Sequence, residues 1–307
     1  MLDRNNQLIA LALQGSRRTN VVLACVLTLV IIAVSTGAGV LLMDRVLFPT
    51  SSYQEDPSLG GAWWLLLDLV LGFGPILILV WMWLRFFEIR PFSSIGLTSR
   101  NIASKVLGGA ALGVAIVAIC FALMSLPGEV AMELGTNNDF PGVAALASLI
   151  LVGIGWTVQA SAEEILLRGW LLQTATLRYG IVVGIGVSSV AFMLIHFMGG
   201  TNSFLSAINL ILGGTFYALY ALYQGSIWGV CAIHAAMNWS EQHLFGFGSN
   251  GNIPGGTIFE MEASGPDIIT GGLARTGAAA SLAYTIVLLV GIVVLLLLFR
   301  RRANATP

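Results

Sequence analysis

The chain contains few charged residues. Only 9% of its 307 residues are Asp, Glu, Lys or Arg, and 57% are hydrophobic, whereas a soluble domain has about 25% charged residues. A water-soluble fold could not accommodate this many apolar side chains without exposing them. Together with long uncharged runs, the shortage of charge predicts a protein that crosses a lipid bilayer several times.

Net charge and cysteine are also scarce. The formal net charge is −1, which gives no indication of a nucleic-acid partner. The three cysteines, Cys25, Cys120 and Cys231, lie far apart in apolar runs; this favours small buried side chains over a disulfide framework. The N-terminal residues are polar and basic, and the apolar run that follows is too long for a cleavable signal. We expect a retained first span.

Apolar segment length predicts an all-α, polytopic membrane helix bundle with about eight spans. Hydrocarbon offers no partner for open backbone groups, so every span should be a helix. The fourth segment is too long for one crossing, and part of it should project from the bilayer. The expected spans are residues 20–43, 63–86, 106–126, 142–177, 180–198, 203–223, 226–244 and 279–299.

The distribution of charge predicts an orientation. Lys and Arg are enriched in cytoplasmic loops, so we expect a multi-pass protein of the plasma or inner membrane with both termini cytoplasmic. The basic residues assigned to that side are Arg4, Arg17, Arg18, Arg85, Arg90, Arg100, Lys105, Arg178, Arg300, Arg301 and Arg302. The acidic residues assigned to the other side are Glu55, Asp56, Glu129, Glu133, Asp139, Glu260, Glu262 and Asp267.

Polar and ionisable residues inside the spans are few and, except for Asp68 in the second expected span, clustered. Charge in a membrane core is costly and is usually paired or functional, so this short set predicts a functional site. Its members lie on three of the expected spans: Gln159, Glu163, Glu164 and Arg168; His196; and His234, Asn238, Glu241 and His243. We interpret His243, near the end of its span, as an interface or capping group.

The site residues can share one depth. Glu163 lies sixteen residues before Tyr179, and His196 sixteen after Gly180, so both should be about 24 Å from the hairpin turn. His234 should be about 13 Å from the turn before its own span. The depth of Glu163 and His196 then agrees with that of His234 if the hairpin protrudes into the cytoplasm by about 10 Å. This places the site nearer the cytoplasmic face.

Helical phase divides the two adjacent glutamates. Glu164 and Arg168 are four residues apart and share a helix face, so they can form a structural pair. Glu163 lies about 100° away around the helix and is left free for chemistry. Glu164 nevertheless belongs to the candidate catalytic set with Glu163.

The cluster supports two hydrolytic interpretations. Glu163 could take a proton from water shared with His196, while His234 and Asn238, four apart, donate to an oxyanion. No serine or cysteine is clearly placed as a nucleophile, which favours direct attack by water. Alternatively, Glu163, His196 and His234 could be three ligands of a zinc ion with an open position for water. Phe192, one turn before His196, could pack over its ring.

Three motifs carry a resemblance to a known family. They are EEILLR at Glu163–Arg168, FMLIH at Phe192–His196 and HAAMN at His234–Asn238. This pattern resembles the CPBP family of CAAX prenyl proteases and bacteriocin-processing, ABI-type membrane endopeptidases, over roughly residues 140–245. Leu167 departs from the family, in which the residue before the arginine is commonly aromatic.

The resemblance implies an intramembrane endopeptidase that acts on a peptide or membrane protein, prenylated or not. It suggests Glu163 as the base aided by His196, with His234 and Asn238 at the oxyanion. Family members have been described as metalloproteases and as metal-free glutamate-dependent proteases, and many bacterial members have no established substrate. The resemblance divides the chain into N-terminal spans (1–140), a catalytic core (141–245), and an external Gly-rich loop with the last span (246–307).

Two alternatives to a protease remain at this stage. The chain could be a non-catalytic immunity or scaffold protein that retains the cluster for stability. It could also be a transporter with a buried proton relay, although the sequence has no inverted repeat to support that class.

Overall fold

The computed structural model describes residues 6–48, 54, 56–128, 130–135, 143–198, 203–247, 253–271 and 277–305. Four residues used above to predict orientation, Arg4, Glu55, Glu129 and Asp139, lie outside the described residues, as do parts of the expected external loop (248–252 and 272–276).

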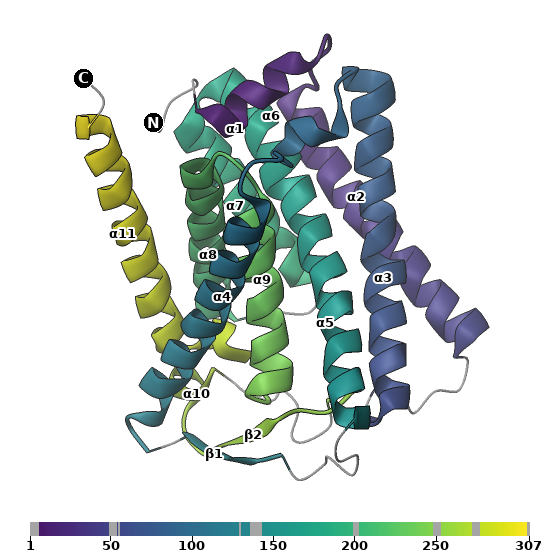
Figure 1. Ribbon diagram of the computed structural model, residues 1–307, viewed down its shortest axis with the longest axis vertical. Helices are drawn as coiled ribbons and strands as arrows, with labels where there is room; N and C mark the ends of the chain where they lie inside the picture. Colours follow the sequence, from purple (N-terminus) through teal and green to yellow (C-terminus); the bar gives the residue numbers. More distant parts are fainter. Residues whose placement is uncertain are drawn as a thin grey trace.

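The protein is a polytopic helix bundle (Figure 1), as the composition predicts. Within the described residues, seven helical segments are long and apolar enough to cross a membrane. Three of them, α2, α3 and α5, continue into π-helical turns. The helices are α2 (Val21–Leu42), α3 (Leu59–Met82), α4 (Ile102–Ser125), α5 (Val143–Glu164) with α6 (Leu172–Tyr179), α7 (Ile181–Met198), α8 (Phe204–Gln224) and α11 (Leu282–Ala305).

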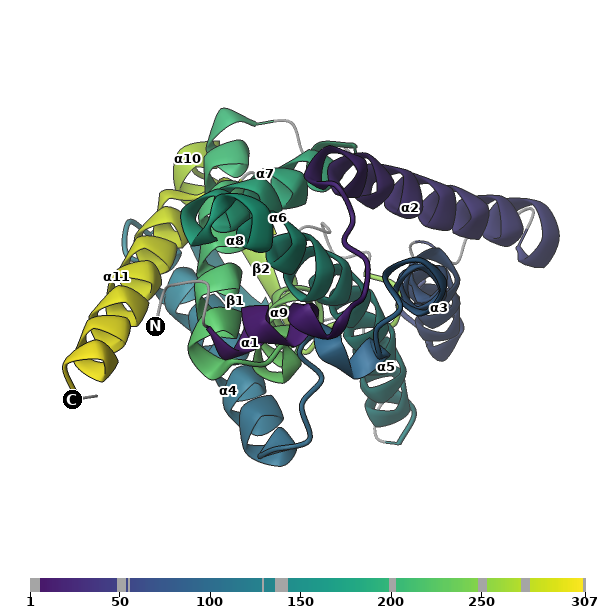
Figure 2. The same ribbon diagram turned by 90° about the horizontal axis from the view of Figure 1, so that it is seen from above.

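Residues 226–244 do not form the membrane span that the sequence predicts. It forms α9 (Trp228–Trp239), which has 12 residues, followed by a π-helical turn at Ser240–Leu244, and it is not among the seven candidate spans. Figure 2 shows α9 in the interior of the bundle, and it packs against α4 and α5. The length of α9 is therefore set by its packing within the protein rather than by the thickness of the bilayer.

The expected long fourth span is confirmed. Helix α5, the π-helical segment Ile165–Leu171 and α6 run without a break over 37 residues, about 55 Å at 1.5 Å per residue. The hydrocarbon core is only about 30 Å thick, so this helix projects beyond it. The hairpin turn lies where the sequence places it, with Gly180 at φ +89° between α6 and α7.

A small two-stranded sheet, which the sequence did not predict, lies at the end of the bundle opposite both termini. Strand β1 (Val130–Leu134) pairs antiparallel with β2 (Phe259–Ala263), and Val130 lies opposite Ala263. The segment expected to be an irregular loop thus contains a strand and the short helix α10 (Asp267–Thr270). The strands lie far from both termini, which share the opposite end of the bundle (Figure 1).

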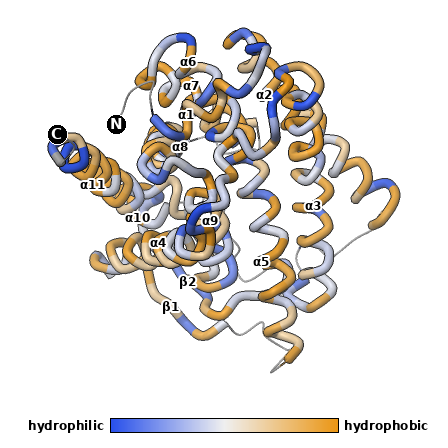
Figure 3. Tube along the Cα trace, turned by 45° about the horizontal axis from the view of Figure 1, so that its top comes forward, coloured by the Kyte–Doolittle hydropathy of each residue, from blue (hydrophilic) through white to orange (hydrophobic). Residues whose placement is uncertain are grey.

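The outward faces of the spans are apolar. Figure 3 shows hydrophobic residues along most of the length of the helices and hydrophilic ones mainly near their ends. Many large hydrophobic side chains are exposed, including Leu107 on α4 and Val182 on α7. In water such a surface would be unstable, whereas lipid covers it at no cost.

Two glycines allow α4 to approach α9 closely. A Cβ atom at Gly109 would lie 2.3 Å from the carbonyl oxygen of Gly229, and one at Gly113 would lie 2.5 Å from that of Ile233. A side chain at either position would push α9 away. This close contact fixes the position of the helix that carries His234.

We expect Gly113→Ala to destabilise the protein by about 1–3 kcal/mol, because the added methyl group overpacks the α4–α9 contact. Gly108→Ala is the matched control, since a Cβ there meets nothing within 4 Å and alanine favours the helix by about 0.5–1 kcal/mol. The measurement is the free energy of unfolding in detergent. Equal stabilities of the two variants would contradict the proposed close contact.

Candidate active site

The adjacent glutamates lie where the long helix changes its hydrogen bonding. Glu164 is the last residue of α5, and the π-helical segment Ile165–Leu171 begins at the next residue. Such wider turns are frequent at functional sites. All residues from Ala162 to Thr176 are buried, so the charges in this stretch must find partners inside the protein.

Glu164 has two partners on one oxygen. Its Oε1 accepts a hydrogen bond from Nη1 of Arg168 at 2.8 Å and another from Nδ1 of His234 at 2.9 Å. Neither Glu164 nor Arg168 is exposed at all. Arg168 also lies 4.6 Å from the ring centre of Phe192. The expected pair Glu164–Arg168 is present, and it extends to the imidazole of His234, for which the sequence predicted an oxyanion or zinc contact instead.

His234 is held in a defined orientation. A carboxylate can only accept, so Nδ1 must carry the proton that it donates to Glu164. The ring of Tyr217 on α8 stacks against the imidazole, with centres 5.1 Å apart and planes 28° apart. This arrangement points Nε2 toward Glu163, whose Oε2 lies 4.0 Å away.

Glu163 is held from one side only. Its Oε1 accepts a hydrogen bond from Nε2 of Gln159, and Oε1 of Gln159 accepts one from Nδ2 of Asn238 at 2.9 Å. Its Oε2 is buried and has no hydrogen-bond partner. Asn238 therefore contacts Gln159 rather than an open part of the site, and one oxygen of Glu163 remains available.

His196 forms no hydrogen bond with these side chains, although Glu163 and His234 are near enough to interact with it electrostatically. Its Nδ1 donates to the carbonyl oxygen of Phe192 at 2.9 Å, and the two rings pack with centres 4.4 Å apart. The side chain is half-buried. No carboxylate oxygen of a described residue lies within 4 Å of a nitrogen of His196, whereas His234 lies within that distance of both Glu163 and Glu164. The structure thus brings His234, rather than His196, to the two glutamates.

The residues suggested as zinc ligands do not converge as a ligand group. Across the described part of the chain, no group of three or more His, Cys, Asp or Glu side chains is arranged to hold a metal ion. Ligation of a zinc ion by Glu163, His196 and His234 therefore stays a prediction, of which this geometry shows only the approach of His234 to Glu163.

His243 and Glu241 belong to a different set of contacts. His243 is fully buried; its Nδ1 donates to the carbonyl oxygen of Gly256, and its Nε2 accepts from Trp156 at 3.0 Å. Glu241 accepts from the backbone N–H of Ala278 at 2.7 Å. His243 is thus an interior residue that fastens the following segment, rather than an interface group.

Two residues of the site were not assigned a role from the sequence. Gln159 precedes Glu163 by four residues, the same spacing as Glu164 and Arg168, so helical phase could have predicted its contact. Tyr217 gives no such signal. It is one of several aromatic residues on α8, and only the packing of α8 against α9 brings it to His234.

The fold and the cluster define a class: a polytopic helical membrane protein with a buried carboxylate–imidazole site. A comparison with protein families gives a more particular assignment. Residues 144–240 match the family described as type II CAAX prenyl endopeptidase Rce1-like, and this segment is an Rce1-like domain of that protease family. It contains the candidate site residues from Gln159 to Asn238, whereas Glu241 and His243 follow its end. A comparison with curated proteins found no match.

Arg168→Met should cost about 3–5 kcal/mol of stability, because it removes the guanidinium that pairs with the buried carboxylate of Glu164 and leaves His234 as the remaining partner of that oxygen. The double variant Glu164→Gln, Arg168→Met removes both charges and should recover most of that loss. The free energies of unfolding in detergent form a double-mutant cycle. Additive effects of the two substitutions would mean that the pair does not stabilise the fold as described.

Proposed function

We propose that the protein is an intramembrane endopeptidase in which Glu163 activates water to attack a peptide bond. The observation that carries the proposal is the unpartnered, buried Oε2 of Glu163, 4.0 Å from Nε2 of His234. A polar oxygen in an apolar interior is costly unless something binds it. A reacting water or substrate group is what such an oxygen would bind in a hydrolase.

The separation of the two atoms suits a bridging water. A water that hydrogen-bonds to both groups at about 2.8 Å, with tetrahedral geometry, holds them about 4.5 Å apart. The distance between Glu163 and His234 is close to that value. A water in this place would lie within reach of the carboxylate that takes its proton and of the imidazole that steadies it.

Charge balance supports the division of roles. The cluster contains two carboxylates, Glu163 and Glu164, and the guanidinium of Arg168, all buried. With His234 protonated, the four groups sum to zero, which lowers the cost of burying them. In that state Glu163 is an ionised base, and Nε2 of His234 carries a proton that it can donate to the oxyanion of the tetrahedral intermediate.

The remaining residues position these groups. Glu164 fixes the ring of His234 from behind, in the way that a buried carboxylate orients a catalytic imidazole elsewhere. Asn238 acts through Gln159, which holds the first oxygen of Glu163. His196 donates through Nδ1, so its Nε2 is left as an acceptor and can take a hydrogen bond from the attacking water or its substrate.

The proposed site lies nearer the end of the bundle that holds both termini. His234 is six residues from the first residue of α9, Trp228, about 9 Å along the helix. If that end is cytoplasmic, as the distribution of Arg and Lys predicts, the bond is cleaved in the cytoplasmic half of the membrane. Because the matched family is described as CAAX prenyl endopeptidases, prenylated peptides ending in CAAX are the first substrates to test.

Glu163→Gln should lower cleavage by about 10²- to 10⁴-fold, since it removes the general base while keeping the hydrogen bond from Gln159. The measurement is the hydrolysis of a fluorogenic peptide library, with prenylated and unprenylated members, by the purified protein in detergent. Glu241→Gln is the matched control, because this carboxylate is also in the interior of the protein but contacts Ala278 outside the cluster; it should retain wild-type cleavage.

Unchanged cleavage by Glu163→Gln would contradict the mechanism. If the folded wild-type protein cleaves no peptide while Glu163→Ala only alters thermal stability, the cluster is structural and the chain is a non-catalytic partner protein.

A further inference from the structure

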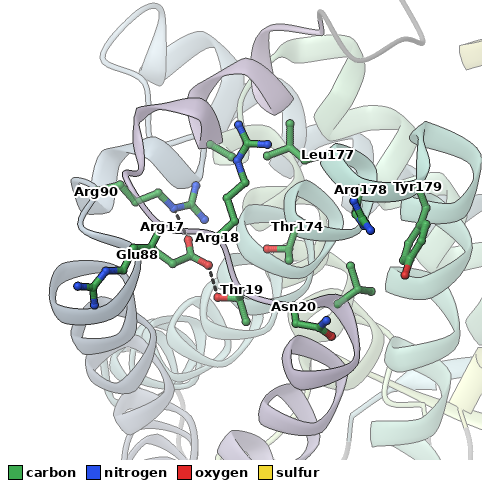
Figure 4. A pocket seen from close by; sticks show the side chains of 12 residues that line it. Arg17, Arg18, Thr19, Asn20, Glu88, Arg90, Thr174, Leu177, Arg178 and Tyr179 are labelled. Atoms are coloured by element: carbon green, nitrogen blue, oxygen red, sulfur yellow. Dashed lines mark hydrogen bonds and ion pairs between the residues drawn. The ribbon is translucent and has the colours of Figure 1, made fainter.

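A second polar region lies outside the candidate active site. It is a pocket of about 460 Å³ between the segment that precedes α2 and the last turns of α6 (Figure 4). This is the end of the bundle that holds both termini (Figure 1). None of the residues of the Glu163–Glu164–His234 cluster lines it, so its chemistry needs a separate explanation.

The one carboxylate that lines the pocket, that of Glu88, has its charge balanced and both of its oxygens bonded within the protein. Oε2 of Glu88 forms an ion pair with Nε of Arg90 at 2.6 Å, and Oε1 accepts hydrogen bonds from Thr19 and from Trp170. Arg90 also donates to Gln173 at 2.7 Å. Both oxygens of Glu88 are therefore used, and its negative charge is already balanced by Arg90.

The rim of the pocket carries three further positive charges. Arg17, Arg18 and Arg178 are exposed and form no ion pair with any described residue. Figure 4 shows Arg18 and Arg178 on either side of Thr174. Because Glu88 is neutralised by Arg90, nothing in the pocket offsets these three charges. The pocket is thus suited to an anion, and guanidinium groups bind phosphate oxygens especially well.

Exposed apolar side chains follow directly after the pocket residues on the two helices that begin there. Val22 at the start of α2 is 71% exposed, and Val182 at the start of α7 is 80% exposed. Helices α2 and α7 lie side by side there (Figure 2). Tyr179, an aromatic residue of the kind enriched at membrane interfaces, lies between the two regions on the pocket's edge. A ligand with a phosphate and hydrocarbon chains would fit both surfaces at once.

We propose that this pocket binds the phosphate headgroup of an anionic phospholipid, whose acyl chains lie along α2 and α7. Basic pockets between membrane helices are a known means of binding such headgroups. The uncompensated arginines recognise the phosphate, and the exposed valines select a molecule that remains in the bilayer. A soluble phosphate would contact the arginines but has no hydrocarbon chains to contact the valines. An experiment can therefore distinguish a lipid headgroup from a soluble phosphate.

The test measures binding of fluorescent phosphatidylglycerol and phosphatidylcholine to the purified full-length chain in neutral detergent, by energy transfer from tryptophan. The pocket variant is Arg17→Gln, Arg18→Gln, Arg178→Gln. The control variant, Arg85→Gln, Arg300→Gln, Arg301→Gln, removes the same charge from exposed arginines outside the pocket. The pocket variant should bind phosphatidylglycerol about 100-fold more weakly, roughly fivefold for each arginine. The control variant and the affinity for phosphatidylcholine should be unchanged.

Three results would overturn the proposal. The first is equal loss of phosphatidylglycerol binding in the pocket and control variants, which would mean that only general charge matters. The second is displacement of the lipid by inorganic phosphate as effectively as by unlabelled phosphatidylglycerol, which would assign the pocket to a soluble anion. The third is full retention of phosphatidylglycerol binding by the pocket variant, with a melting temperature equal to that of the wild-type protein, which would mean that these three arginines do not bind the headgroup.

Discussion

One carboxylate oxygen, Oε1 of Glu164, accepts hydrogen bonds from an arginine and a histidine in the protein interior. Arg168 and His234 both approach it within 3 Å. A buried glutamate needs a partner of opposite charge, and Arg168 alone would meet that need. The contact with His234 turns a structural pair into a support for the imidazole. It joins α9 to the long helix, and we assign the proposed reaction to Glu163 because its Oε2 faces Nε2 of His234.

The rest of the bundle maintains this contact. The long fourth helix extends beyond the hydrocarbon, so its charged turn lies inside the membrane while its end reaches water. The glycines of α4 allow α9 to lie deep enough for His234 to reach Glu164. On the far side Tyr217 stacks on the imidazole, and Arg168 lies over Phe192. The site is therefore enclosed by helices that are far apart in sequence, which excludes bulk water from the proposed reaction.

Local rules predicted much of this arrangement. Lipid permits only helices as spans here, and four-residue spacing gave the pair Glu164–Arg168; the turn at Gly180 also lies where segment length placed it. The features that were missed depend on helices that meet only in the folded chain. The bond from His234 to Glu164, the link from Asn238 to Gln159, the short α9 and the pairing of β1 with β2 all require knowledge of how distant segments pack.

The protonation of His234 is the most direct test of the central contact. The chain has three histidines, so the nitrogen NMR spectrum of the purified protein, with labelled histidine, contains few imidazole signals. We predict that Nδ1 of His234 carries a proton. Its ¹⁵N chemical shift should change in Glu164→Gln, while the chemical shifts of His196 and His243 should stay the same. A His234 ring protonated on Nε2 alone, or a spectrum unaffected by Glu164→Gln, would contradict this account.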